Sequence, residues 1–381
     1  MKQPHLLHVF PSFETGGAQV RTVILMNALG ASYRHTVVAM NGDYSAGKRL
    51  DTSIAVTTLN PPPKGSVYST SRRFASLLDE LRPNLLLTYN WGAIEAVMGS
   101  ILAPVCPVVH VEDGFGPDEA SGLKARRVWT RRVVLRRAST IAVPSRTLER
   151  IALGQYWLPR RKVEFIPNGV DTARFAPRSN PEFRAAMGLP ADAFVVGTVG
   201  RLRPEKDLAT LVQRFKAAGI PDSRLVFIGD GPSRLEIESA ARAQGIAAQC
   251  FFAGEFVDTS ACYGAFDLFA MTSITEQMPI GLLEAMSAGL PVLCTAAGDT
   301  AEILEGSPGP QVLPGPQSAQ YLEALRSLAA DADLRRRNGA WNRERVISNY
   351  SLDAMVRRWD HLYRQAAHME PPPAGQNQDV P

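Results

Sequence analysis

The sequence predicts an α/β protein with two doubly wound parallel sheets, each forming the centre of a Rossmann-like domain. Short segments rich in Val, Ile and Leu recur along the chain and alternate with stretches of helical periodicity. Several of these segments are almost continuously apolar, which is typical of strands buried on both faces of a parallel sheet. The pattern starts again near the midpoint, and a length of 381 residues suits two domains.

The apolar segments give the expected strands. In the first half these are Leu6–Phe10, Thr36–Met40, Asn84–Tyr89, Pro107–Val111 and Thr140–Pro144. In the second half these are Phe194–Val199, Arg224–Ile228, Cys250–Ala253, Leu268–Thr272 and Pro291–Thr295. Between the two sets, Pro167–Phe183 is rich in Pro, Asn and Gly and lacks periodicity, so we interpret it as a linker. Residues 1–170 then form the N-terminal domain and residues 171–350 the C-terminal domain.

The end of the chain has a different character. The stretch Asn342–Ala367 has helical periodicity, with Trp359 and Tyr363 four residues apart, and we assign residues 351–368 to a C-terminal helix. The last residues, EPPPAGQNQDVP, are rich in Pro and Gln and poor in apolar groups. We expect residues 369–381 to form a disordered tail.

The composition narrows the functional classes. Hydrophobic residues make up 45% of the chain and charged residues 20%, which excludes disordered, collagen-like and coiled-coil classes. The four cysteines are far apart and form no CxxC pair, so we expect no disulfide framework or zinc site and favour a reducing cytosol. No apolar run approaches 18 residues, and the first residues lack a signal-peptide pattern. We therefore expect a cytoplasmic protein that contacts a membrane, if at all, from its inner surface.

Charge is distributed unevenly along the chain. Residues 1–170 hold 21 basic and 12 acidic side chains, a net of +9, whereas the remainder has a net of −5. The segment Lys124–Arg137 alone carries seven basic residues and no acidic one. It could contact an anionic membrane or acceptor, form a solvated helix, or bind nucleic acid. No nucleic-acid-binding motif accompanies the charge, so we predict no nucleic-acid partner.

The most informative motif is TEQMPIGLLEAMSAGLPV, residues Thr275–Val292, which follows an expected strand. Glu276 falls in the strand-to-helix loop, where a carboxylate can accept hydrogen bonds from sugar hydroxyls. Glu284 lies within the helix that begins near Pro279, and the start of that helix offers free N–H groups suited to a pyrophosphate. A pair of surface glutamates on an amphipathic helix is the alternative interpretation.

Two further loops follow expected strands. In GTVGRLRPEKDL, Arg201 and Lys206 could clamp a diphosphate at the carboxyl edge of the sheet, although a solvated basic loop fits equally well. In ETGGAQVR, consecutive Gly16 and Gly17 permit close approach of the backbone to a phosphate or sugar. Taken alone, this second motif is better interpreted as a plain turn.

Taken together and in order, these motifs resemble those of the retaining glycosyltransferases of the GT-B fold, in the large family 4, or group 1, of nucleotide-sugar-dependent enzymes. The resemblance covers nearly the whole chain. It rests on GGAQV (Gly16–Val20), FIPNGVDTARF (Phe165–Phe175), GRLRPEKDL (Gly200–Leu208), FIGDGPSRLEIE (Phe227–Glu238) and the two glutamates followed by EAMSAGLPV. It implies two Rossmann-like domains facing a cleft, with the C-terminal helix returning to the N-terminal domain.

The resemblance also implies roles for residues at the donor. Glu284 would contact the ribose hydroxyls of the nucleotide, and Glu276 would lie near the donor sugar and stabilise charge at its anomeric centre. Arg201 and Lys206 would hold the diphosphate. The remaining donor contacts would come from Pro279, Ile280 and Gly281 at the helix start, from Gly16 and Gly17 across the cleft, and from Glu255, Phe256 and Val257 near the base.

Two positions depart from the family pattern. Members commonly have a His just after the fourth strand, close to the donor sugar, but here the stretch is VVHVEDGFGPDE. Either His110 or Asp113 could face the sugar, and a buried His110 bonded to backbone is the alternative. Gln277-Met278-Pro279 replaces the commoner Gly-Phe-Gly, which leaves the identity of the donor open.

Metal binding is a separate question. Asp331-Ala-Asp333 matches the Asp-x-Asp pattern that holds a metal in glycosyltransferases of another fold. It lies in a helical stretch and does not follow a strand, so we interpret it as a helix cap. The GT-B resemblance implies no metal and no cofactor, because Arg, Lys and a helix dipole would take the metal's place.

The leading prediction is therefore a retaining glycosyltransferase that moves a sugar from a nucleotide-sugar to a glycan or lipid-linked acceptor. The usual setting of similar proteins is the synthesis of cell-surface polysaccharide or glycolipid. A sugar-nucleotide epimerase or glycosyl phosphorylase on the same fold, or a non-catalytic nucleotide-sugar-binding protein, are the alternatives. A nicotinamide dehydrogenase is disfavoured, because no GxGxxG follows a strand with an acid about 20 residues further on.

Overall fold

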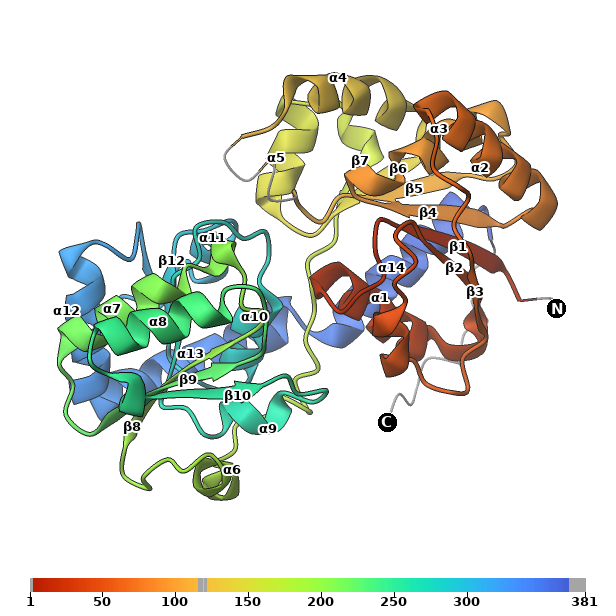
Figure 1. The fold of residues 1–381 in the computed structure, drawn as a ribbon. Helices are drawn as coiled ribbons and strands as arrows, with labels where there is room; N and C mark the ends of the chain where they lie inside the picture. Colours follow the sequence, from red (N-terminus) through yellow and green to blue (C-terminus); the bar gives the residue numbers. More distant parts are fainter. Residues whose placement is uncertain (1–2, 116–118, 120–121, 370–381) are drawn as a thin grey trace. The chain divides into compact units, whose positions relative to one another are not determined.

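The computed structural model describes residues 3–115, 119 and 122–369. They divide into two compact units, one within Met1–Pro167 and Met355–Pro381 and the other within Asn168–Ala354. Each unit holds one parallel sheet with helices packed on its faces (Figure 1). The prediction of two doubly wound parallel sheets is thus confirmed. Apart from Met369, the tail expected at 369–381 lies outside the described residues.

In the described part of the first unit, the sheet has the order β3-β2-β1-β4-β5-β6-β7, and all neighbouring strands are parallel. Its strands are β1 (His5–Phe10), β2 (Arg34–Ala39), β3 (Val56–Leu59), β4 (Leu85–Tyr89), β5 (Val108–Val111), β6 (Thr140–Val143) and β7 (Val163–Phe165). The five expected strands are present with slightly shifted ends. Sequence analysis missed β3 and β7, which are short and lie at the two edges, where partial exposure weakens the apolar pattern.

Helices cover both faces of this sheet. They are α1 (Gly17–Leu29), α2 (Val67–Leu81), α3 (Ile94–Leu102), α4 (Ala125–Val134), α5 (Arg146–Gly154) and the part of α14 (Leu352–Ala366) from Met355 onward. Leu7, Val9 and Leu86 point to one face, where they form a buried core with residues of α2, α3 and α5. Because side chains alternate along a strand, the intervening residues face the opposite layer.

Helix α14 is part of the first unit's interior. Trp359 is only 2% exposed and lies under the guanidinium of Arg21, 5.3 Å from its ring centroid. The Tyr33 hydroxyl donates to Asp360 Oδ1 at 2.5 Å, and the Tyr33 and Tyr363 rings meet edge to face. The C-terminal helix assigned to residues 351–368 corresponds to α14, and the rest of the helical stretch from Asn342 belongs to α13, which ends at Asn349.

The sheet of the second unit has the order β10-β9-β8-β11-β12-β13 and is also parallel. Its strands are β8 (Phe194–Val199), β9 (Ser223–Ile228), β10 (Cys250–Gly254), β11 (Leu268–Met271), β12 (Val292–Thr295) and β13 (Val312–Leu313). Its helices are α6 (Pro181–Ala186), α7 (Leu208–Ala218), α8 (Arg234–Ala243), α9 (Ser260–Tyr263), α10 (Ile280–Ser287), α11 (Thr300–Ile303), α12 (Ala319–Ala330) and α13 (Ala332–Asn349). The five expected strands are present, and only the two-residue β13 was missed.

The strands of this second sheet are buried on both faces, as their continuous apolar sequence predicts. Val195 and Val226 belong to a core that includes residues of α10 and α13. Their chain neighbours Val196 and Leu225 belong to a second core with residues of α7, α8 and α12. The strand register thus divides each apolar segment between two layers.

The segment Pro167–Phe183, which we interpreted as a linker, is mostly part of the second unit. Val170 and Phe175 are buried in its core, and the Phe175 ring packs against Tyr263 at 5.8 Å. Val170 also pairs with Ser351 through a β-bridge. The linker interpretation fails because the segment, although rich in Pro, Asn and Gly, contains two apolar residues, Val170 and Phe175, that are buried in the core.

Two further observations concern binding partners. In the part of the chain that the structure describes, no helix is both long and apolar enough to cross a membrane. The Asp331 carboxylate accepts a hydrogen bond from the Leu334 N–H and caps α13, as expected for Asp331-Ala-Asp333. Among the described residues, no group of three or more His, Cys, Asp or Glu side chains is placed to hold a metal ion.

The packing of α14 generates a stability prediction. Trp359→Ala removes a large buried side chain and should lower the free energy of unfolding by about 3–5 kcal/mol. Urea unfolding followed by circular dichroism measures this change. Trp129→Ala, at a side chain that is 58% exposed, is the matched control and should change the stability by less than about 1 kcal/mol. Equal effects of the two variants would contradict the placement of α14.

Candidate active site

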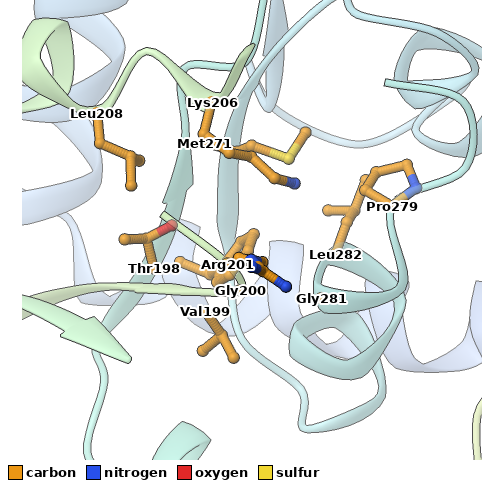
Figure 2. A pocket seen from close by; sticks show the side chains of 11 residues that line it. Thr198, Val199, Gly200, Arg201, Lys206, Leu208, Met271, Pro279, Gly281 and Leu282 are labelled. Carbon is orange, nitrogen blue, oxygen red and sulfur yellow. The ribbon is translucent and has the colours of Figure 1, made fainter. Parts of the chain in front are cut away.

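The candidate site lies in the second unit, where β8 and β11 are neighbours at the centre of the sheet. The chain connects β8 outward to β9 and β11 outward to β12, so the strand order reverses between them. Ligands bind at such a reversal, beyond the carboxyl ends of the strands. A pocket opens there. Figure 2 shows the residues that line it, including Arg201 and Lys206 from the loop after β8 and Pro279, Gly281 and Leu282 from the start of α10.

Two oppositely charged side chains connect the loops that follow β8 and β11. The Lys206 ammonium forms an ion pair with Glu276 Oε1, and the Ser273 hydroxyl donates to the same oxygen at 2.8 Å. The Lys206 side chain is 24% exposed and the Glu276 side chain 13%. The structure therefore brings the two predicted residues together, next to the pocket that Arg201 also lines.

The backbones of these loops are also joined. The Thr272 hydroxyl donates to the carbonyl oxygens of Lys206 and Asp207, at 3.2 and 2.9 Å. The Ile274 N–H donates to the Glu205 carbonyl at 2.8 Å, and the Thr295 hydroxyl donates to the Ser273 carbonyl at 2.6 Å. Three loops at one edge of the sheet thus hold one another in place.

Glycines allow this close packing. Gly229 and Gly231, in the loop after β9, adopt positive φ angles, and a Cβ at either position would collide with the backbone of Gly200 or Leu202. Gly298, after β12, has φ +59, and a Cβ there would collide with the carbonyl of Glu276. Sequence analysis quoted Gly229 and Gly231 only as part of a family motif and missed Gly298, although a Gly beyond the end of a strand is a signal of this kind.

Asn168 supports the loop that carries Glu276. Its side-chain amide donates to the Met278 carbonyl at 2.9 Å, and its backbone N–H contacts Met278 Sδ at 3.1 Å. Both residues are buried. The departure at Gln277-Met278-Pro279 from the family pattern therefore coincides with a contact that uses the methionine sulfur. This role of Asn168 was also missed.

Helix α10 begins at the pocket. The backbone N–H groups of Ile280 and Gly281 have no hydrogen-bond partner in the part of the chain that the structure describes, and they lie at the positive end of the helix dipole. A Cβ on Gly281 would lie 3.0 Å from the Val199 carbonyl, so glycine lets α10 approach the end of β8. This arrangement suits an anionic group such as a diphosphate.

Glu284 lies one turn further along α10, and its carboxylate contacts α9 and the residue before that helix. Its Oε2 accepts a hydrogen bond from the Tyr263 hydroxyl at 2.6 Å and one from the Thr259 hydroxyl at 3.4 Å. Burial raises the pKa of Glu284 to about 7, against the effect of these two hydrogen bonds. Tyr263 and Thr259 were not among the predicted site residues, because nothing in their sequence context distinguishes them from core and loop residues.

The loop expected to meet the nucleotide base follows β10. The side chain of Glu255 is exposed, and Val257 is 76% exposed. Phe256 is half-buried and packs against Phe183, with ring centroids 5.6 Å apart. Their contact with a base stays a prediction.

The other predicted residues belong to the first unit. Gly16 caps the start of α1 and Gly17 is its first residue, and Gly16 has extended backbone (φ −161), so neither needs a left-handed conformation. Asp113 forms a bidentate ion pair with Arg21, whose Nη1 and Nη2 lie 2.5 and 2.9 Å from its Oδ1 and Oδ2. The Asp113 N–H donates to Asn90 Oδ1. Their contact with a donor sugar stays a prediction.

His110 lies within β5 and is fully buried. Its Nδ1 is 2.8 Å from the Thr88 hydroxyl, and its Nε2 is 3.8 Å from Glu112. This is the buried histidine of our alternative interpretation, with a side-chain partner in place of a backbone one. Of the two candidates, His110 lies inside the sheet, and Asp113 lies beyond the strand end with both carboxylate oxygens paired to Arg21, so which of them faces the sugar stays a prediction.

Two family models match consecutive parts of the chain and together account for most of it. Residues 15–174 match Glycosyltransferase Family 4, and residues 179–345 match Glycosyl transferases group 1. Solved structures agree over nearly the full length. The structure of Anabaena Alr3699/HepE in complex with UDP-glucose has a TM-score of 0.82 at 18% identity, covering 95% of this chain and 99% of that one. WaaG, a glycosyltransferase involved in lipopolysaccharide biosynthesis, has a TM-score of 0.73 at 17% identity, with coverage of 95% and 99%.

Relatives of higher sequence identity than these solved structures are also glycosyltransferases. The chain is 30% identical over 305 residues to 2-deoxystreptamine N-acetyl-D-glucosaminyltransferase of Streptomyces fradiae, which covers 75% of this chain and 72% of that protein. It is 28% identical over 201 residues to UDP-Gal:alpha-D-GlcNAc-diphosphoundecaprenol alpha-1,3-galactosyltransferase of Escherichia coli, covering 50% and 52%. For most of the curated relatives the match spans about half of their length.

The two parallel-sheet units and the solved structures show that the chain has the GT-B fold. The chain belongs to the group 1 glycosyltransferases.

The contact between Gly298 and Glu276 generates a prediction about the site. Gly298→Ala would place a Cβ against the Glu276 carbonyl at a positive φ, which costs about 1–2 kcal/mol and displaces the loop. We expect binding of a nucleotide-sugar, measured by calorimetry, to weaken at least tenfold while the circular dichroism spectrum is unchanged. Gly315→Ala is the matched control, because its Cβ would meet no atom within 4 Å. Unaltered binding by Gly298→Ala would show that the loop tolerates displacement.

Proposed function

We propose that the chain is a retaining, metal-independent glycosyltransferase that moves a sugar from a nucleotide-sugar to a glycan or lipid-linked acceptor in cell-surface polysaccharide or glycolipid synthesis. The observation that carries the proposal is the pocket in which Arg201, Lys206 and the free N–H groups of α10 converge beside Glu276. The relatives include a galactosyltransferase named for a diphosphoundecaprenol-linked acceptor and a glycosyltransferase of lipopolysaccharide core biosynthesis, and these support the acceptor class.

Each side chain has a task in this reaction. Arg201, Lys206 and the start of α10 would stabilise the additional negative charge that develops on the diphosphate as the nucleotide leaves. Glu276 would hold a hydroxyl of the donor sugar and stabilise the positive charge at the anomeric carbon. The bond from that carbon to the diphosphate oxygen breaks and a bond to the acceptor oxygen forms on the same face. The acceptor proton passes to the leaving phosphate oxygen.

This proposal predicts that Glu276→Ala and Lys206→Ala each lower turnover at least about 100-fold, because each removes a charge next to the reacting centre. Transfer of label from UDP-, GDP- or ADP-sugars to an extracted lipid-linked glycan acceptor measures turnover. The donors are first ranked by the melting temperature that each produces. Glu323→Ala and Lys216→Ala, at exposed positions of the same unit, are matched controls.

Several outcomes would contradict this assignment. Wild-type rates in both site variants would remove Glu276 and Lys206 from the mechanism. Conversion of the donor without an acceptor would favour an epimerase, and failure to bind any nucleotide-sugar would favour a non-catalytic protein. Loss of activity in EDTA, or a product of inverted anomeric configuration, would overturn the metal-independent or the retaining part of the proposal.

We also propose that the enzyme acts in the cytoplasm at the inner face of the membrane, through the segment Lys124–Arg137. In the structure this segment forms α4 and the short turn after it. Trp129 and Val133 are exposed on it, and Trp157 from the loop after α5 joins them. The Arg132 guanidinium lies between the two indoles, 4.6 Å from the Trp129 centroid and 3.5 Å from the Trp157 centroid. Exposed tryptophans beside arginines suit the headgroup region of an anionic bilayer.

The membrane proposal predicts that Trp129→Ala combined with Trp157→Ala weakens binding to phosphatidylglycerol-containing vesicles about tenfold. The double substitution removes two indoles whose apolar area the bilayer would bury. Co-sedimentation measures the bound fraction. Tyr68→Ala, which removes an aromatic side chain that is 66% exposed on α2, is the control. Equal vesicle binding by the double variant and the control would contradict the proposed surface.

A further inference from the structure

The carboxylate of Glu284 has two oxygens in unlike surroundings. Oε2 accepts hydrogen bonds from Tyr263 and Thr259, at 2.6 and 3.4 Å. Oε1 has no hydrogen-bond partner in the part of the chain that the structure describes. A carboxylate with one oxygen fixed by protein donors presents the other in a defined direction, and this is the arrangement that a ligand hydroxyl can use.

Tyr263 is well placed to fix that direction. It is fully buried at the end of α9, and its ring packs edge to face against Phe175 and Phe266, with centroids 5.8 and 6.0 Å away. Its hydroxyl also lies 3.3 Å from the Gly281 carbonyl, but the shorter contact to Glu284 is the stronger one. The ring therefore cannot turn away without disturbing the core.

We propose that Tyr263 is a positioning residue of the donor site, which holds Glu284 ionised and oriented so that Oε1 accepts hydrogen bonds from the vicinal hydroxyls of a nucleotide ribose. This inference rests on the proposed function, because it assigns a task to Tyr263 at the nucleotide end of the same site. Tyr263 itself does not touch the nucleotide.

The charges around Glu284 show why its ionisation needs support. Burial raises its pKa to about 7, and the nearby Asp258 carboxylate acts in the same direction. Hydrogen bonds from Tyr263 and Thr259 and the positive charge of Arg174 oppose this rise. The thiol of Cys262, on the same short helix as Tyr263, has a pKa of about 12 and stays neutral. Removing the Tyr263 hydroxyl removes the largest of the opposing effects, so the pKa of Glu284 would rise further.

The sign of the pH dependence follows. A ribose hydroxyl donates to the ionised carboxylate, so affinity for a ribonucleoside diphosphate is highest above the pKa of Glu284 and falls as the pH drops through it. A higher pKa moves this fall to higher pH. At pH 7 the variant would therefore bind more weakly, although every group that meets the diphosphate is intact.

The test uses Tyr263→Phe in the full chain, with UDP, GDP or ADP as the probe, whichever binds the wild type most tightly. We expect affinity at pH 7 to fall about tenfold and the midpoint of the binding–pH curve to rise by about one unit. Affinity for inorganic pyrophosphate should be unchanged, because it meets only Arg201, Lys206 and α10. Tyr321→Phe is the matched control, because that buried hydroxyl has no hydrogen-bond partner among the described residues.

Glu284→Gln completes the experiment. It should remove the contribution of Glu284 to the pH dependence and leave only that of the diphosphate itself, and adding Tyr263→Phe to it should weaken binding no further. A binding–pH curve that coincides with the wild type, in Tyr263→Phe or in Glu284→Gln, would overturn the inference while leaving the proposed function intact. The second outcome needs no tyrosine variant, so it remains decisive if Tyr263→Phe does not fold. A wild-type chain that binds no nucleoside diphosphate overturns the proposed function and this inference with it.

Discussion

The ion pair between Lys206 and Glu276 is the interaction on which the candidate site depends. It joins the loops after β8 and β11, the two strands between which the strand order reverses. Both side chains are largely removed from water, so each charge needs the other. In the proposed reaction, a diphosphate in the pocket would give Lys206 a second anionic partner and would leave the Glu276 carboxylate able to accept from a sugar hydroxyl.

This ion pair forms only because three loops approach more closely than ordinary side chains allow. Gly298 lies against the backbone of Glu276, and Gly229 lies against the backbone of Gly200, next to Arg201. Thr272 and Thr295 then cross-link the loops through their hydroxyls. Backbone contacts thus bring the loops together, and the ion pair then connects the Lys206 and Glu276 side chains.

Two kinds of feature could be predicted from the sequence: strands with a repeating apolar pattern, and charged residues in the loops that follow strands. Continuous apolar segments predict buried parallel strands, and ten such segments became strands of the two sheets. Arg201, Lys206 and Glu276 could be found because they follow strands. Tyr263 and Asn168 could not be found, because their importance comes from one partner each, 21 and 110 residues away. The edge strands and the buried anchor Phe175 were missed because short or irregular segments carry little periodic signal.

The distribution of charged side chains differs between the two units. In the first unit, Glu112, Asp113 and Glu119 are held in ion pairs with Arg131, Arg21 and Arg127, so these interior acids offset interior arginines. The excess positive charge of residues 1–170 is therefore concentrated at the surface, where it would attract an anionic acceptor of the proposed reaction over about a Debye length. The rest of the chain is net negative, so its overall field opposes an anionic donor. Donor binding must then come from short-range contacts in the pocket, which makes it more sensitive to loop geometry than to ionic strength.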